Sequence, residues 1–373
     1  MATVYFLGAG ASAADGIPTT PQLNYGVAKG LREYGKRAGH LRTYYKDLYG
    51  VTDAVINAAA RRWDQYLPNR DLKYLAEHSG FPDLIETLSL IDVCIGEDQS
   101  LGMSSMRTGR RGYVEMNPGF LRRARQQLTF AIGRAVQSAS YNLRAQHTRR
   151  LVASVNAEDT IISTNWDMLV DRCFVSIRSK LRNSRWLTQS PVRYHCVGER
   201  PVDWRGNDIG TARNARSVLR LHGAINWFGC ACCGTVYVNL GGSYIMDELD
   251  RRPDYDDCHC GAGLLTTMVA PSYLKDYRSV SLRSVWREAQ KRLEAATQWV
   301  FIGYSLPSDD FHIRAMLMRA LRSRPQSRPQ TKDVQVFLRN DGAGQSARAR
   351  FVDFFRVTKP DIRMTGFAGF ARP

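Results

Sequence analysis

The most informative stretch of this 373-residue sequence is TVYFLGAGAS, residues 3–12. Its first five residues are β-branched, aromatic or aliphatic, which favours a strand, and a glycine turn, Gly8-Ala9-Gly10, follows at once. Such a turn between a strand and a helix lets backbone N–H groups approach a phosphate at the positive end of the helix dipole. Ser12 could add a hydroxyl. The full Gly-x-Gly-x-x-Gly pattern is absent because position 13 is alanine, so an ordinary tight turn is the alternative interpretation.

The same order of apolar strand, polar loop and helix recurs along the chain. Further strands are predicted at 160–164, 218–221, 299–302 and 334–338, and each is followed by polar or glycine residues: Asn165-Trp166-Asp167, His222-Gly223, Gly303-Tyr304-Ser305 and Asn340. Short apolar strands that alternate with helices predict an α/β fold, a Rossmann-like parallel sheet with helices on both faces. The polar residues then lie at carboxyl ends of strands, where open α/β sheets bind ligands.

Helical patterns dominate residues 24–150. Leu84, Leu88 and Ile91 share one helical face, and Asn117-Pro118 is typical of a helix start. We therefore expect a helical insertion or lobe at 24–150, a small cysteine-rich module at 230–263, and a Rossmann-type core formed by 1–23, 151–229 and 264–373.

The composition is that of an ordinary globular protein, 44% hydrophobic and 23% charged. No stretch approaches the roughly 18 to 20 apolar residues that span a bilayer. The apolar start has no preceding basic residue and is too short for a signal peptide. We expect a cytoplasmic protein.

The net charge of +17 is unevenly distributed. Residues 107–150 contain ten arginines and one acid, Glu115, and residues 314–373 contain thirteen Lys or Arg and four acids. These two segments hold the entire excess. One interpretation is a surface for polyanions such as nucleic acid or for an acidic partner; the other is that the arginines only decorate solvated helix faces.

Five of the eight cysteines lie between residues 230 and 260. Cys230-Ala231-Cys232-Cys233-Gly234 contains a Cys-x-x-Cys-Gly turn, which presents thiolates to tetrahedral zinc. The second half, Cys258-His259-Cys260-Gly261, is irregular. We predict a structural zinc site of Cys230, Cys233, Cys258 and Cys260, and Asp257, His259 or Cys232 remain possible substitutes for Cys258. The scattered Cys94, Cys173 and Cys196 are interpreted as buried thiols.

Asn165, Asp167 and His222 carry groups suited to catalysis at a strand end. A histidine can act as a base near neutral pH, an amide can orient water or a ribose hydroxyl, and a carboxylate can accept hydrogen bonds. The alternative is three unrelated loop residues that cap helices or bond to the backbone.

Taken together, the motifs resemble those of a known family. In content and order, GAGAS with Gly16-Ile17-Pro18, STNWD at 163–167, His222-Gly223, the paired cysteines, GYSL at 303–306 and Asn340 are similar to the motifs of sirtuins. The resemblance is closer to the bacterial sirtuin-like proteins of antiphage defence. It spans residues 4–341, nearly the whole chain.

The resemblance implies a Rossmann-type NAD site with three groups of residues. Gly8, Ala9, Gly10 and Ser12 would hold the dinucleotide phosphates. Asn165 and Asp167 would line the nicotinamide and ribose pocket, with His222 as base on a ribose hydroxyl or on water. Gly303, Ser305 and Asn340 would contact the adenosine half.

Departures from the deacylating sirtuins concern the acyl-peptide half of the site. Thr19-Thr20-Pro21 stands where those enzymes have Phe and Arg, and Thr164 stands where they have Gln. Their peptide-binding segment is replaced by residues 269–273, in which Pro271 cannot donate to an added strand. We therefore expect an NAD glycohydrolase that releases nicotinamide and ADP-ribose. The alternatives are an NAD-dependent protein deacylase and a non-enzymatic NAD- or nucleic-acid-binding regulatory subunit.

The resemblance also bears on partners. NAD hydrolysis is toxic unless regulated, so the likeness to defence proteins implies control by homo-oligomer assembly, by a partner ATPase of the HerA type, or by nucleic acid at the basic segments.

Overall fold

The computed structural model describes residues 2–75, 80–107, 113–141, 143–182, 189–203, 207–240, 258–275, 280–323, 334–356 and 358–370. The chain divides into two compact units. The first contains residues 1–15, 142–268 and 277–373, and the second contains residues 16–141 and 269–276.

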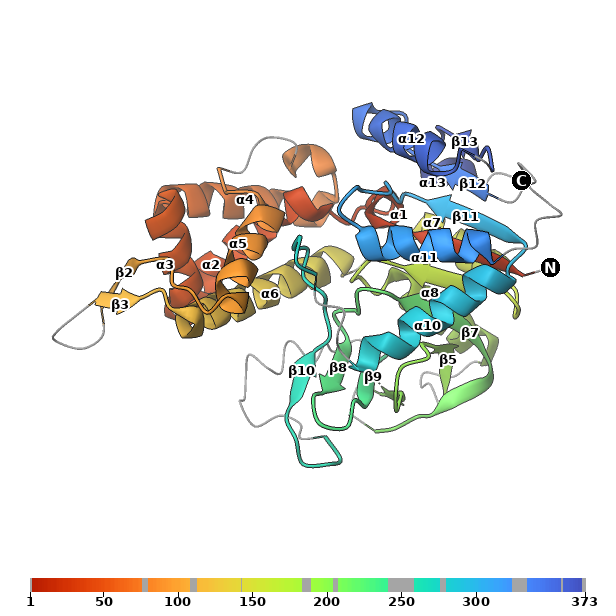
Figure 1. Ribbon diagram of the computed structural model, residues 1–373, viewed down its shortest axis with the longest axis horizontal. Coiled ribbons are helices and arrows are strands. Elements are labelled where there is room, and N and C mark those ends of the chain that lie inside the picture. Colours follow the sequence, from red (N-terminus) through yellow and green to blue (C-terminus); the bar gives the residue numbers. More distant parts are fainter. Residues whose placement is uncertain are drawn as a thin grey trace. The chain divides into compact units, whose positions relative to one another are not determined.

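The first unit is built on a seven-stranded sheet whose strands all run parallel (Figure 1). In spatial order they are β13 (Asp361–Arg363), β12 (Val334–Phe337), β11 (Gln298–Ile302), β1 (Thr3–Leu7), β4 (Thr160–Ser163), β7 (Thr211–Arg220) and β5 (Ser190–Arg193). Strands β4 and β11 are buried on both faces over almost their whole length, which explains their apolar runs Ile161–Ile162 and Trp299–Ile302. Phe6 and Phe301, from neighbouring strands, pack with ring centroids 5.3 Å apart.

Helices cover both faces of this sheet. They are α1 (Ala9–Ala14), α7 (Gln146–Ser154), α8 (Leu169–Arg182), α10 (Val280–Ala295), α11 (Phe311–Arg322), α12 (Gly342–Phe354) and α13 (Gly366–Phe370). Right-handed crossovers assign α7 and α8 to one face and α10 and α11 to the other. The packing agrees, because α7 contacts α8 and α10 lies beside α11 (Figure 1). The predicted α/β fold with a parallel sheet is confirmed.

The strand order locates the candidate site. From β1 the sheet continues through β4 on one side, whereas from β11 it continues through β12 on the other. Connections that leave neighbouring strands in opposite directions create a topological switch point, where open α/β sheets bind ligands. The glycine turn after β1 and the Gly303 loop after β11 lie at this point.

A second sheet in the first unit carries the cysteine-rich segment. Its order is β10 (Leu264–Thr266), β8 (Trp227–Cys230), β9 (Val236–Asn239) and β6 (Arg200–Val202). Strands β8 and β9 form an antiparallel hairpin, and β10 pairs antiparallel to β8 with Leu264 opposite Cys230. The register therefore brings both cysteine pairs to one end of this sheet.

The second unit is mainly helical. Its elements are η1 (Thr20–Gln22), α2 (Leu23–Tyr34), η2 (Gly35–Ala38), α3 (Gly39–Tyr49), α4 (Asp53–Asn69), η3 (Leu72–Leu75), α5 (Leu84–Gly96), β2 (Met103–Arg107), β3 (Tyr113–Glu115) and α6 (Pro118–Ser140). Helix α6 begins as predicted: Pro118 is its first residue, and Asn117 Oδ1 accepts a 2.9 Å hydrogen bond from Phe120 N.

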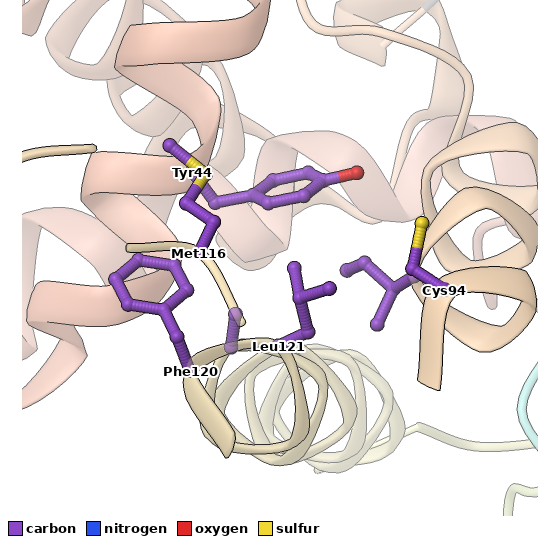
Figure 2. Close-up of a cluster of buried hydrophobic side chains, with 7 residues drawn as sticks. Tyr44, Cys94, Met116, Phe120 and Leu121 are labelled. Atoms are coloured by element: carbon purple, nitrogen blue, oxygen red, sulfur yellow. The ribbon is translucent and has the colours of Figure 1, made fainter. Parts of the chain in front are cut away.

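The α6 helix organises the core of this unit by packing against α2, α3 and α5. One buried cluster joins Tyr44 of α3, Cys94 of α5 and Phe120 and Leu121 of α6 (Figure 2). Cys94 is thus a buried thiol, as its apolar surroundings predict. Within the described ranges of either unit, no helix has the length and apolar character that a membrane span requires.

Candidate active site and metal centre

The glycine turn after β1 packs directly on the loop after β11. Gly10 N donates a 2.8 Å hydrogen bond to Gly303 O. A Cβ on Gly303 would lie 2.1 Å from Ala11 N, and the φ of Gly303 is +61°, a left-handed conformation that favours glycine. A Cβ on Gly8 would lie 2.5 Å from Tyr304 Cα. The main role of these glycines is therefore to let the backbone of the turn after β1 approach the backbone of the loop after β11.

Ser12, Asn165 and Asp167 form one hydrogen-bonded chain beside the turn. The Ser12 hydroxyl donates to Asp167 Oδ2 at 2.6 Å and accepts from Asn165 Nδ2 at 2.8 Å. Asn165 Nδ2 also donates to Gly8 O at 2.9 Å. These contacts follow from the parallel pairing of β1 with β4, in which Leu7 lies opposite Ser163. Three residues predicted separately from the sequence are thus in direct contact.

Asp167 is a buried carboxylate with both oxygens used. Oδ2 accepts from Ser12, and Oδ1 accepts a 2.9 Å hydrogen bond from Leu169 N at the start of α8. Burial raises the pKa of Asp167 above its ordinary value, although the positive charge of Arg220 and the Ser12 hydrogen bond partly oppose the shift. The Ser12 hydroxyl therefore stabilises the ionised form.

His222 follows the carboxyl end of β7, the strand next to β4. Its side chain is largely buried, 8% exposed. Leu221 N donates to Ser163 O at 3.0 Å, so the His222 turn is joined to the segment that leads into Asn165. Gly223 has φ +68°, and a Cβ there would lie 2.3 Å from Thr267 O. The His222-Gly223 turn is therefore tightly packed at the same sheet edge as the Ser12 chain.

Sequence reasoning missed a buried ion pair beneath these loops. Arg220 and Asp171, 1% and 0% exposed, form a salt bridge, and Arg220 also donates to Asn165 O at 3.0 Å. Burial opposes the charge of Arg220, but the Asp171 and Asp167 carboxylates raise the pKa of Arg220 above its usual range. The sequence does contain a signal for this ion pair, because Arg220 lies inside the apolar run 218–221 and a buried arginine needs an acidic partner.

Ser305 and Asn340 follow β11 and β12 at the same sheet edge, and both are exposed. Ser305 O accepts a 2.9 Å hydrogen bond from Arg350 Nε, and Asn340 Oδ1 accepts from Gln345 Nε2 at 3.4 Å. The side chains that follow five neighbouring strands, β12, β11, β1, β4 and β7, thus offer hydroxyls, amides, a carboxylate and an imidazole. This set can bind a polar ligand and assist bond cleavage with proton transfer.

The four predicted cysteine ligands come together in the second sheet. The Sγ atoms of Cys230, Cys233, Cys258 and Cys260 all lie within 4.8 Å of one another. Tetrahedral zinc with Zn–S bonds of about 2.3 Å separates its sulfurs by roughly 3.8 Å, so the cluster could hold zinc. Two tight turns shape it, with Gly234 N bonded to Cys230 O and Gly261 N bonded to Cys258 O.

The alternative ligands are arranged differently. Cys232 is exposed and does not belong to the four-cysteine cluster. His259 Nδ1 lies 3.4 Å from Cys258 Sγ and 3.2 Å from the Tyr237 hydroxyl. Asp257 lies outside the described residues. A hydrogen bond with Thr235 lowers the pKa of Cys233 to about 6, which favours the thiolate form that binds metals.

No family model matches the chain. No curated protein is significantly similar to it in sequence. Solved structures similar to it include a Sir2 homolog–NAD complex, with 12% identity, a TM-score of 0.40, and coverage of 99% of this chain and 86% of that chain. Another is Sir2 with the inhibitor EX-527, 2′-O-acetyl-ADP-ribose and deacetylated p53 peptide, with 12% identity, a TM-score of 0.37, and 100% and 91% coverage. A third is Sir2 bound to acetylated peptide, with 12% identity, a TM-score of 0.36, and 100% and 91% coverage.

Proposed function

We propose that this protein is an NAD glycohydrolase, which cleaves the bond between nicotinamide and ribose to give nicotinamide and ADP-ribose. The observation that carries the proposal is the hydrogen-bonded chain Asn165–Ser12–Asp167 at the switch point of the parallel sheet. Asn165, Ser12 and Asp167 are also residues that the resemblance to sirtuins assigns to an NAD site.

The chemistry of the reaction suits these groups. Departure of nicotinamide leaves an oxocarbenium-like ribose, which needs an oriented leaving group, nearby negative charge and a water molecule at the opposite face. The buried Asp167 carboxylate supplies charge in a low-dielectric setting. Asn165 orients the ribose or water, and His222 acts as the base.

The zinc module has a structural part in this proposal. Cys230, Cys233, Cys258 and Cys260 would hold the ion, and four sulfur ligands leave no open position for a substrate. Bound zinc supplies folding free energy at the end of the second sheet rather than chemistry on NAD.

The segment at 269–273 favours hydrolysis over protein deacylation. Ser272 N donates to Ala270 O at 2.9 Å, and Tyr273 N donates to Ser89 Oγ at 2.8 Å. Pro271 has no N–H. Because these backbone donors are already used or absent, the segment is poorly suited to pair with an acyl peptide as an added strand.

We also propose how the activity is controlled. The resemblance to bacterial antiphage-defence proteins favours an effector that depletes the cytoplasmic NAD pool when it assembles as a homo-oligomer or meets a partner ATPase of the HerA type. The basic segments 107–150 and 314–373 would supply a surface for assembly or for nucleic acid.

The test is to incubate the purified protein with NAD and to quantify nicotinamide and ADP-ribose by chromatography. Three parallel reactions contain NAD alone, NAD with an acetylated peptide, and NAD with duplex DNA. We expect both products without peptide, and none from the His222→Ala variant. Nicotinamide release that requires the peptide would instead identify a deacylase. Bound NAD that stays intact in all three reactions would show that the protein has no glycohydrolase activity of its own, as the non-enzymatic alternative predicts.

A further inference from the structure

A buried polar network lies directly beneath the loop that carries Asn165 and Asp167. Arg220 is the last residue of β7, and its Nη2 pairs with Asp171 Oδ2 in the first turn of α8. The other oxygen of Asp171 accepts a hydrogen bond from the Tyr194 hydroxyl. Arg220, Asp171 and Tyr194 are each at most 1% exposed.

The network also reaches the backbone of the loop. Arg220 Nη1 donates a 3.0 Å hydrogen bond to the carbonyl oxygen of Asn165. One guanidinium thus joins the end of β7 to a segment some 50 residues earlier in the sequence, the loop after β4 and the first turn of α8 that follows it. The side chain of Asn165 is held from the other direction by Gly8 O and Ser12 Oγ.

Burying the Arg220–Asp171 ion pair costs free energy, so a role in fixing the geometry of the loop would explain its presence. Removing two charges from water carries a large desolvation penalty, and well-packed apolar residues of similar volume often stabilise a fold equally well. A guanidinium offers something that apolar residues lack, because its planar fork fixes the direction of several hydrogen bonds at once. Here two of those directions lead to Asp171 and to the peptide group that follows Asn165.

We propose that Arg220 is a positioning residue for NAD cleavage, which locks the Asn165 peptide group so that the amide, Ser12 and Asp167 keep their hydrogen-bonded geometry. The proposal rests on the glycohydrolase function proposed above. Asp171 and Tyr194 act through Arg220, since they hold its guanidinium in place. Arg220 also precedes His222 by two residues, so the same anchor fixes the turn that carries the proposed base.

The test is Arg220→Lys, because lysine keeps the charge but cannot reach Asp171 and Asn165 O with a planar fork. Arg216→Lys is the matched control: it lies on the same strand, and its Nε donates to Val155 O at 3.3 Å, away from the site. Two readouts are needed, the steady-state kinetics of NAD cleavage and the hydrogen exchange of backbone amides in residues 163–168.

For Arg220→Lys we expect kcat to fall about 10- to 100-fold through misplacement of the catalytic groups, with KM within about threefold of wild type. Amides of residues 163–168 should exchange faster than in wild type. Arg216→Lys should match wild type in both readouts. If Arg220→Lys does not fold, Tyr194→Phe tests the same network more gently, with a smaller loss of kcat and the same change in exchange.

Three outcomes would overturn the proposal. In the first, Arg220→Lys equals wild type both in kcat and in the amide exchange of residues 163–168. In the second, these amides exchange faster but kcat is unchanged. In the third, kcat falls but the amides do not exchange faster. If the wild-type protein cleaves no NAD, the glycohydrolase proposal fails by itself. In that case the role of Arg220 as an anchor of the loop is refuted only if Arg220→Lys leaves the amide exchange of residues 163–168 unchanged.

Discussion

The hydroxyl of Ser12 donates a 2.6 Å hydrogen bond to the buried Asp167 carboxylate, although 155 residues separate them in sequence. This bond favours ionised Asp167, whose pKa burial raises above the ordinary value. A carboxylate with a raised pKa becomes protonated at a higher pH than an exposed aspartate does. The acid-side loss of NAD cleavage should therefore begin at a higher pH than an ordinary aspartate would give.

Ser12→Ala removes a donor that stabilises the carboxylate, so the pKa of Asp167 should rise further. We expect the acid limb of kcat/KM, measured between about pH 4 and 8, to move to higher pH. Asp167→Asn should lack this limb because an amide does not titrate. Ser154→Ala, which removes an exposed hydroxyl bonded to Leu151 O, is the control. Coincident profiles for Ser12→Ala and wild type would contradict the assignment.

His222→Ala should abolish NAD cleavage while it preserves most of the affinity for NAD. General-base assistance is typically worth roughly 100- to 10,000-fold, so the loss should lie mainly in kcat. Steady-state kinetics and calorimetric NAD binding measure the two effects. His312→Ala changes an exposed histidine of α11 and should leave both unchanged. Full turnover by His222→Ala would mean that another group is the base.

Cys233→Ser and Cys232→Ser are neighbouring substitutions with opposite expected results. Cys233 belongs to the four-cysteine cluster, whereas the exposed Cys232 does not. We expect a single zinc ion per chain in wild type and in Cys232→Ser by elemental analysis. In Cys233→Ser, zinc should be lost and the thermal midpoint lowered, because a closed sulfur site contributes folding free energy. Stable wild-type protein without metal would refute the zinc assignment.

The basic segments should bind duplex DNA in a salt-dependent manner. Arg122 and Arg123 of α6 are exposed, as are Arg348 and Arg356 after β12. Each phosphate contact contributes a slope of about −0.9 in the logarithm of affinity against the logarithm of salt. Replacing Arg122 and Arg123 by glutamate should weaken binding and reduce this slope. Salt-insensitive behaviour of a protein that stays monomeric would argue against both nucleic-acid binding and assembly.

The parts of the fold predicted from the sequence are those encoded locally. Strands β1, β4 and β11 each contain an apolar run, Val4–Leu7, Ile161–Ile162 and Trp299–Ile302, that is largely buried in the sheet. Asn117-Pro118 marks the start of α6 by capping chemistry alone. The helix α12 and the short strand β13 escaped prediction. The first turn of α12 contains two glycines, Gly342 and Gly344, which weaken the helical signal in the sequence. Asp341 nevertheless caps this helix, because its Oδ1 accepts a 2.8 Å hydrogen bond from Gly344 N.

The site was predictable residue by residue but not as a network. Ser12, Asn165 and Asp167 each follow a predicted strand, yet their contacts depend on β1 pairing with β4, which no local pattern encodes. Arg220 and Asp171 are 49 residues apart. Their pairing requires α8 to start beneath the end of β7, which is a tertiary property.

Gly303→Ala should damage the protein at the contact between the glycine turn and the loop after β11. The new Cβ would lie 2.1 Å from Ala11 N and 2.3 Å from Gly10 C, both backbone atoms that cannot move aside easily, and the φ of +61° strains any L side chain. We expect a loss of more than about 1 kcal/mol in the free energy of unfolding. Because Gly10 N is bonded to Gly303 O, the same shift should displace Ser12 and weaken NAD binding. Gly342→Ala is the matched control, since no atom lies within 4 Å of its added Cβ and alanine favours the start of α12. Denaturant unfolding and calorimetric titration with NAD separate the two effects. Gly303→Ala with wild-type stability and NAD affinity would show that this close approach is not needed for either.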